Sequence, residues 1–291
     1  RCRILNYTLQ NKTMKKLLIF STLYLIVQLL NAQPVDKKLG KITFHMVDGE
    51  YEDAASKAEK LREDAEYRKN GWVYYYMSQA YFEIAGMPEL QEDYPKAFKE
   101  SLKAAYKLEK YKAKPEENID VWNNAQEFLS ILKDSAITVS EIYYDNEDYR
   151  KAAYYLKSIT RFAPDDYGVW LMKGVYEIKS RNVGEGIKSI IFAMDSLTPE
   201  YIPHEVSAPT LVDALDEFAL IVKSGEYDQY FKSYKYNPTQ KDIDNAMDLK
   251  SIFMKYMKKD EVIDKEDRKK ESEIIYKTFR SDDEEEEDEE D

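Results

Sequence analysis

A short motif recurs four times along the chain: an acidic residue, a tyrosine, two variable residues, and then a small or aromatic residue. The copies are Glu50-Tyr51-x-x-Ala54, Asp93-Tyr94-x-x-Ala97, Asp148-Tyr149-x-x-Ala152 and Glu226-Tyr227-x-x-Tyr230. Each copy follows an apolar stretch with helical spacing and opens another. The recurrence predicts a helix–turn–helix unit repeated along the chain. Because one pair of helices cannot bury its own apolar face, we expect neighbouring units to stack.

The composition supports an all-α protein. With nine glycines and nine prolines in 291 residues, the chain has few of the turn residues that a β-protein needs. Its 43% hydrophobic and 34% charged residues suit a soluble globular or solenoid protein of one or two domains.

The chain resembles the tetratricopeptide repeat family, whose unit of about 34 residues has small residues at its eighth and twentieth places and a tyrosine at its eleventh. Residues 133–166 match with Ala136, Ser140, Tyr143, Ala152, Leu156, Ile159 and Pro164, and residues 167–200 follow without a gap, with Trp170, Gly174, Gly186, Ile190 and Ala193. Residues 71 to about 110 match with Tyr74, Ser78, Tyr81, Ala97 and Ala104, and carry an insertion from Gly86 to Asp93. Residues 35–68 match through Tyr51, Ala54, Ala58 and Leu61, with Ile42 at the eighth place and His45 at the eleventh. Residues 211–238 match chiefly at the turn.

The resemblance implies an all-α fold over residues 33–258, a right-handed superhelical solenoid whose small residues let paired helices approach closely. Two segments depart from simple repetition. Apolar spacing from Trp122 to Tyr143 predicts one long helix over roughly 120–145. Residues 239–258 predict an amphipathic helix, with Thr239 as its N-cap, that closes the array.

The N-terminal segment is typical of an export signal over residues 14–32. Met14 is followed by two lysines, and an apolar run of 14 residues extends from Leu17 to Leu30. The alternative is a retained membrane anchor, although a spanning helix needs about 20 apolar residues. Residues 1–13 are expected to be sequence upstream of the true start. The signal predicts a periplasmic or secreted protein, with association with the outer membrane as one option, and no transmembrane span once the signal is removed.

The charge is negative and is concentrated at the C-terminus. The net charge is −13, and residues 282–291 are all Asp or Glu. A negative body and tail argue against nucleic-acid binding, which needs a cationic surface. We expect residues 259–291 to be a charged, disordered tail. Weak calcium binding by this tail is an alternative to a purely solubilising role, because Ca²⁺ takes oxygen ligands.

Motifs for catalysis are missing from the sequence. The single cysteine, Cys2, lies in the leader, so the exported chain would have no disulfide and no thiolate site. The two histidines, His45 and His204, do not have metal-ligand spacing and are interpreted as packing or surface residues. The segment from Gly184 to Ser189 only faintly resembles a phosphate loop, because no glycine directly precedes Lys188. The prediction is therefore a non-enzyme without a cofactor.

In tetratricopeptide repeats the first helix of each unit lines a concave groove. Carried over to this sequence, the groove residues are Trp72, Tyr75, Gln79, Phe82, Ile137, Glu141, Tyr144, Leu171, Val175 and Ile178. Their aromatic and aliphatic character predicts an apolar peptide segment or a partner helix as ligand. The alternative is that these side chains are buried between units.

The leading functional hypothesis is an adaptor of the bacterial cell envelope that holds a protein partner in this groove. A second hypothesis is a calcium-responsive or chaperone-like protein that acts through its acidic tail. A third is a glycan-binding accessory, since aromatic side chains also stack on sugars. The third is weakened because sugar-binding lipoproteins with such repeats are anchored through a cysteine, which this chain has only at Cys2.

Overall fold

The computed structural model describes residues 36–114, 116 and 118–257, and these residues form α-helices and short 3₁₀ turns without any strand. The helices are α2 (Lys37–Asp48), α3 (Tyr51–Glu63), α4 (Gly71–Ala85), α5 (Ala97–Tyr111), α6 (Asn118–Asn124), α7 (Gln126–Asp145), α8 (Tyr149–Phe162), α9 (Tyr167–Lys179), α10 (Val183–Ser196), α11 (Ala208–Ser224), α12 (Asp228–Ser233) and α13 (Gln240–Phe253). The 3₁₀ turns are η1 (Pro88–Leu90), η2 (Glu205–Ser207) and η3 (Met254–Tyr256). The expected leader, signal and acidic tail lie outside the described residues.

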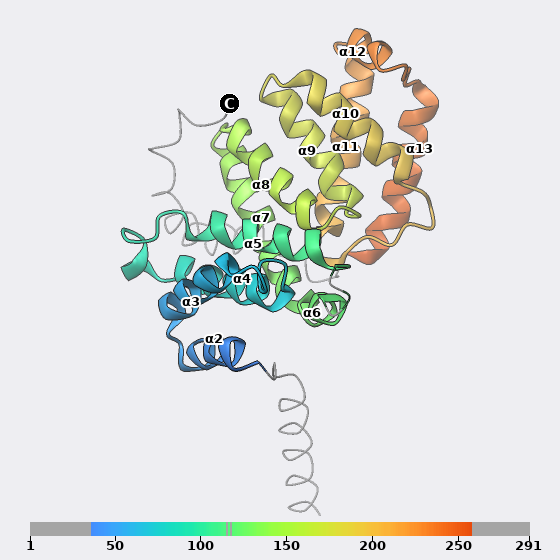
Figure 1. Cartoon of the computed structure of the whole chain (residues 1–291). Helices are drawn as coiled ribbons and strands as arrows, with labels where there is room; N and C mark the ends of the chain where they lie inside the picture. Colours follow the sequence, from blue (N-terminus) through green and yellow to red (C-terminus); the bar gives the residue numbers. More distant parts are fainter. Residues whose placement is uncertain (1–35, 115, 117, 258–291) are drawn as a thin grey trace, which may run out of the picture.

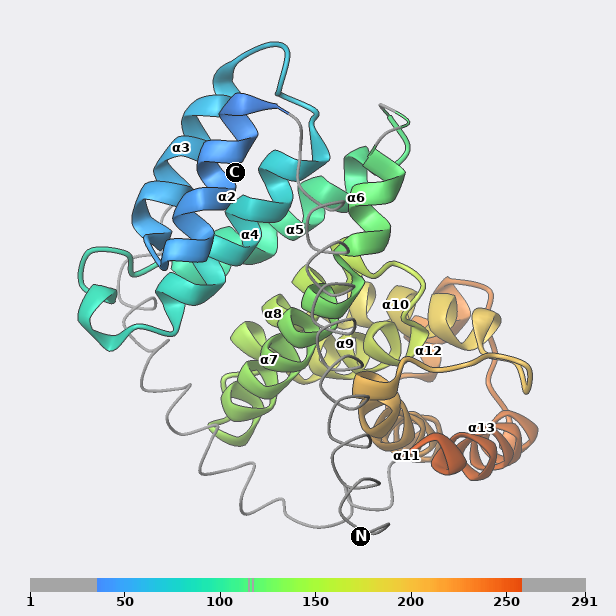
Figure 2. The same ribbon diagram turned by 90° about the horizontal axis from the view of Figure 1, so that it is seen from below.

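Helices pack mainly against their neighbours along the chain, which is the arrangement expected of a helical repeat. Helices α2 to α5 form one end of the molecule and α9 to α13 the other, with α7 and α8 between them (Figure 1 and Figure 2). The all-α prediction is therefore confirmed for the described part of the chain.

Four turns between paired helices share one backbone geometry. In each, a residue with positive φ follows the first helix: Gly49 (76°), Glu147 (63°), Arg181 (69°) and Gly225 (66°). In the first three, the next amide N–H donates over 2.9 Å to a carbonyl five residues earlier, from Glu50 to His45, from Asp148 to Tyr143 and from Asn182 to Glu177. This is the Schellman closure of a helix C-terminus. The sequence motif thus marks this turn at three of its four copies, whereas no residue with positive φ precedes Asp93-Tyr94 in the described part of the chain and the turn at Arg181 lacks the motif.

Paired helices approach closely at the predicted small residues. Gly174 of α9 faces Gly186 of α10, and Ser140 of α7 donates a 2.7 Å hydrogen bond to the carbonyl of Ala152 in α8. In the second unit Ser78 and Ser101 exchange hydrogen bonds with each other's carbonyls, at 2.9 and 2.7 Å. In this unit α4 and α5 approach closely at Ser101, one helical turn after Ala97, the residue predicted for this contact. The insertion between the two helices is therefore longer than the sequence match indicates.

The fifth unit departs from the repeat. The places that hold small residues in α9 and α10 are occupied here by Phe218, which is fully buried, and Tyr230. Helix α12 is only six residues long and packs against α10, while α13 packs against α11. Large residues at both positions do not allow the close approach that Gly174 and Gly186 make in the fourth unit. The predicted final helix is confirmed as α13, with a capping box between Thr239 and Asp242.

The prediction of one helix over 120–145 is wrong, since α6 and α7 are separate helices that meet at Ala125. Helix α6 belongs to the second unit, because its buried Asn118 joins three backbone groups there. Its Oδ1 accepts from the Gly71 N–H at 2.7 Å, and its Nδ2 donates to the carbonyls of Lys69 and Tyr111 at 2.7 and 2.9 Å. Helix α7 pairs with α8 instead. The chain thus changes packing partner at Ala125, and α6 ends and α7 begins at this residue because their packing partners differ.

The second and third units meet through their second helices, α5 and α8. Phe98 of α5 contacts Tyr155 of α8 with ring centroids 6.0 Å apart, and Tyr155 stacks on Tyr143 of α7 at 5.6 Å. All three side chains are buried. This joint differs from that between the first two units, where α4 packs against both α2 and α3.

A buried ion pair connects the last three units. The Lys133 ammonium in α7 donates to the carboxylate of Asp166, the N-cap of α9, at 2.8 Å. The Ser207 hydroxyl, just before α11, donates to the same carboxylate at 2.6 Å. One side chain therefore links the first helices of three successive units.

Candidate functional site

The four groove residues predicted in the second unit lie together on one face of α4. Trp72 and Tyr75 are in edge contact, with ring centroids 5.8 Å apart. The Gln79 side-chain amide donates to the Tyr75 hydroxyl at 3.0 Å. Phe82 continues the face, and all four side chains are partly buried, so each keeps some surface in contact with solvent.

Phe128, near the start of α7, completes this face. Its ring lies 6.0 Å from that of Tyr75 and 5.7 Å from that of Phe82, edge-on in both cases. The sequence placed Phe128 only in the apolar stripe of a helix, because its neighbours on α4 are more than 40 residues away in the chain. We call the group formed by Trp72, Tyr75, Gln79, Phe82 and Phe128 the aromatic face.

Helix α2 supports the aromatic face through a contact with Tyr76. Tyr76, buried beside the face, stacks against Trp72 at 5.6 Å, and the Thr43 hydroxyl of α2 donates to the Tyr76 hydroxyl at 2.9 Å. Burial raises the pKa of both Tyr75 and Tyr76 above the ordinary value of tyrosine. Both phenols therefore stay protonated and neutral at physiological pH.

Two of the predicted groove residues of α7, Glu141 and Tyr144, lie in a second, polar group. Tyr144 stacks on Tyr176 of α9 with centroids 4.5 Å apart, and the Lys179 ammonium donates to the Tyr144 hydroxyl. Lys179 also pairs with Glu217 of α11 at 3.3 Å. Partial burial opposes the charge of Lys179, but the Tyr144 hydrogen bond and the Glu217 carboxylate outweigh it and raise the pKa of Lys179. Glu141 is exposed one turn before Tyr144.

The remaining predicted groove residues are in the interior. Leu171 and Val175 have no exposed surface, and Ile137 and Ile178 are 5% exposed. They lie where α9 meets its neighbours α8, α10 and α11 or, for Ile137, on the buried side of α7. In this conformation they stabilise the array and offer no surface to a ligand. The structure thus brings four of the ten predicted residues into one face, and two more into a separate polar group.

None of the helices in residues 36–257, apart from the undescribed positions 115 and 117, is long and apolar enough to cross a membrane.

The chain matches no protein-family model and no curated protein sequence.

Proposed function

We propose that this protein is a non-catalytic scaffold of the bacterial cell envelope, built as a tetratricopeptide-like solenoid, that binds a partner protein on the aromatic face. The observation that carries the proposal is the continuous contact from Trp72 through Tyr75 to Phe128 and Phe82, with each ring partly open to solvent. Large aromatic side chains on a rigid helix bind well, because little conformational entropy is lost on association.

The chemistry of the face favours an apolar or aromatic peptide segment, or the apolar side of a helix. The five side chains carry no formal charge, and their polar atoms are the indole N–H, a phenol and an amide. A partner segment would bury its own apolar residues on the rings and use the amide of Gln79 for orientation. The envelope location rests on the signal-like segment over residues 14–32.

A photocrosslinking experiment tests the proposal. The crosslinker p-benzoylphenylalanine is placed at position 79, at the centre of the face, and in a second chain at position 192, because Phe192 is an exposed aromatic residue on α10. In native envelope preparations we expect one protein to crosslink at position 79 and not at 192.

The Trp72→Ala/Tyr75→Ala chain supplies the affinity control. It should reduce capture of that protein at least about tenfold, as expected for loss of two aromatic anchors. The control variant Phe192→Ala/Tyr234→Ala, which removes two exposed aromatic residues away from the aromatic face, should leave capture unchanged. Circular dichroism of both variants checks that the helices remain. Equal crosslinking at positions 79 and 192, or equal capture by the two double variants, would overturn the proposal.

A further inference from the structure

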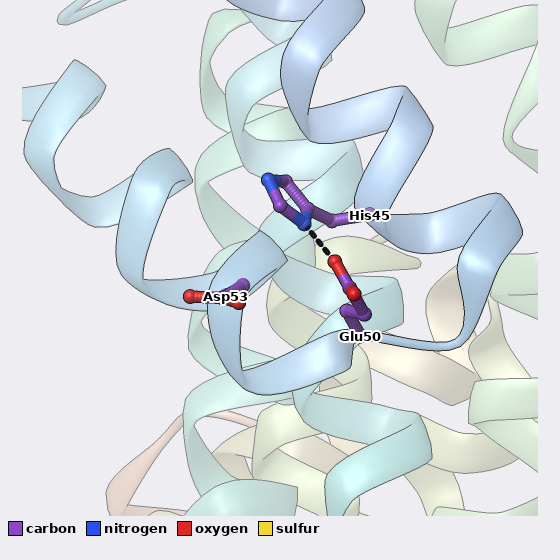
Figure 3. A group of neighbouring side chains, drawn as sticks. All are labelled: His45, Glu50 and Asp53. Atoms are coloured by element: carbon purple, nitrogen blue, oxygen red, sulfur yellow. Dashed lines mark hydrogen bonds and ion pairs between the residues drawn. The ribbon is translucent and has the colours of Figure 1, made fainter.

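A histidine and two carboxylates surround the first helix–helix turn (Figure 3). His45 lies in the last turn of α2, Glu50 is the N-cap of α3, and Asp53 lies in the first turn of α3. One ligand-type atom from each residue lies within 4.8 Å of those of the other two. The His45 Nδ1 atom is 2.5 Å from the Glu50 carboxylate.

The backbone that carries these side chains is rigid. Gly49 closes α2 in the left-handed conformation, and the Glu50 N–H donates to the carbonyl of His45 itself at 2.9 Å. The Ala54 N–H donates to the Glu50 carbonyl at 3.0 Å, which begins α3. The Cα positions of all three residues are therefore set by backbone hydrogen bonds, and a ligand needs to order only the exposed carboxylate side chains.

The equivalent turns of the molecule serve as internal comparisons. The three places hold Tyr143, Asp148 and Lys151 in the third unit, where Lys151 pairs with Asp148 at 3.5 Å. In the fourth unit they hold Glu177, Asn182 and Glu185, and in the fifth unit Ile221, Glu226 and Gln229. The first turn thus has the shared backbone, but an imidazole replaces the repeat tyrosine and a carboxylate stands where the third unit has an ammonium.

We propose that His45, Glu50 and Asp53 bind a Zn²⁺ ion. Zinc accepts imidazole nitrogen and carboxylate oxygen together, whereas calcium takes oxygen ligands alone. Zinc–ligand bonds of about 2.0–2.2 Å place tetrahedral ligand atoms about 3.4 Å apart. Zinc binding would require the exposed Glu50 and Asp53 side chains to rotate, so that ligand atoms now within 4.8 Å of one another reach that spacing and the 2.5 Å contact between His45 and Glu50 opens.

Three protein ligands leave the fourth zinc position to water or to a group of another molecule. The ion would hold the end of α2 to the beginning of α3. Helix α2 contacts only α3 and α4 extensively among the described helices, so a metal bridge there would stabilise the first unit.

Calorimetric titration of the full chain with Zn²⁺ tests the site, together with Co²⁺ absorption as a report of ligand geometry. We expect His45→Ala and Asp53→Asn to weaken the tightest zinc site about tenfold or more and to remove the visible bands of four-coordinate Co²⁺. Asp53 is exposed on the helix surface, so Asp53→Asn keeps the fold and separates ligand loss from misfolding.

His204→Ala is the matched control, since this exposed histidine also lies near a carboxylate, 4.0 Å from Asp165. It should leave zinc affinity within about twofold of the parent chain. The proposal is overturned if the parent, His45→Ala and Asp53→Asn chains bind zinc equally, as they would if the acidic tail held the metal. It is also overturned if His204→Ala removes the tightest site.

Discussion

Gly174 of α9 and Gly186 of α10 lie so close that a Cβ atom added to either would be 2.7 Å from the carbonyl oxygen of the other. The side chains of Ile190 and Ile178 would be met at 2.8 and 2.7 Å. Two glycines at the eighth and twentieth places of one unit thus fit each other across the helix pair. This packing requirement explains Gly186, one of the two glycines that give residues 184–189 their faint likeness to a phosphate loop.

Gly174→Ala should destabilise the protein by about 1–3 kcal/mol, because the added methyl group forces the backbones of α9 and α10 apart. Chemical denaturation followed by circular dichroism measures the change. Gly40→Ala is the control: Gly40 lies inside α2, and a Cβ atom added there would meet no neighbouring group of the described residues within 4 Å. Alanine at position 40 should therefore stabilise the protein by about 0.5–1 kcal/mol. Equal effects of the two substitutions would contradict the close-packing explanation.

The four left-handed turn residues differ in how well they suit their backbone. Glu147 and Arg181 have φ of 63° and 69°, which costs a residue with a side chain about 1 kcal/mol relative to glycine. Glu147→Gly and Arg181→Gly should therefore raise the free energy of unfolding by up to about 1 kcal/mol, against the usual effect of glycine. Gly49→Ala should lower the free energy of unfolding by a similar amount. The cost there comes from the positive φ alone, because an added Cβ atom would meet no described neighbour within 4 Å. Urea titrations of the three chains measure the changes.

The Lys133–Asp166 pair should be sensitive to loss of one partner. Their side chains are 5% and 1% exposed, so Asp166→Ala leaves a buried ammonium without its counter-charge and should cost about 3–5 kcal/mol. Lys133→Met/Asp166→Ala should recover part of this loss. The exposed Lys38–Asp64 pair provides the comparison, and Lys38→Met should change stability little. Thermal unfolding of the parent chain and the three variants measures the differences.

A partly buried tyrosine, Tyr236, predicts a loss of stability at alkaline pH. Burial, with smaller contributions from Asp242 and Asp195, raises the pKa of Tyr236 from 10.0 to about 12. Because the pKa is higher in the folded state than in the unfolded state, the protonated phenol stabilises the folded protein. This stabilisation is fully present below the unfolded pKa near 10 and is lost as the pH rises toward 12. The free energy of unfolding should fall between pH 10 and 12. The free energy of unfolding of the Tyr236→Phe variant should fall less steeply, as denaturant titrations at pH 9 and 11 would reveal.

The features that could be predicted from the sequence are those that depend on residues close together in the chain. Apolar spacing indicated helices, the acid–tyrosine motif marked the turns after Gly49, Glu147 and Gly225, and Thr239 marked the start of α13. The spacing of twelve residues from Gly174 to Gly186 indicated their contact, because a helix–turn–helix unit of regular length brings those places together. These signals are local, so a short stretch of sequence carries each of them.

Which surfaces remain open to solvent, and where the chain changes packing partner, could not be predicted from the sequence. The break at Ala125, the shift of the close approach from Ala97 to Ser101 and the joint between α5 and α8 all depend on contacts distant in the sequence. The same applies to Leu171 and Val175, whose burial is set by flanking helices, and to Phe128, which reaches the aromatic face from another unit. Helical periodicity tells which side chains share a face, but packing between units decides whether that face meets solvent.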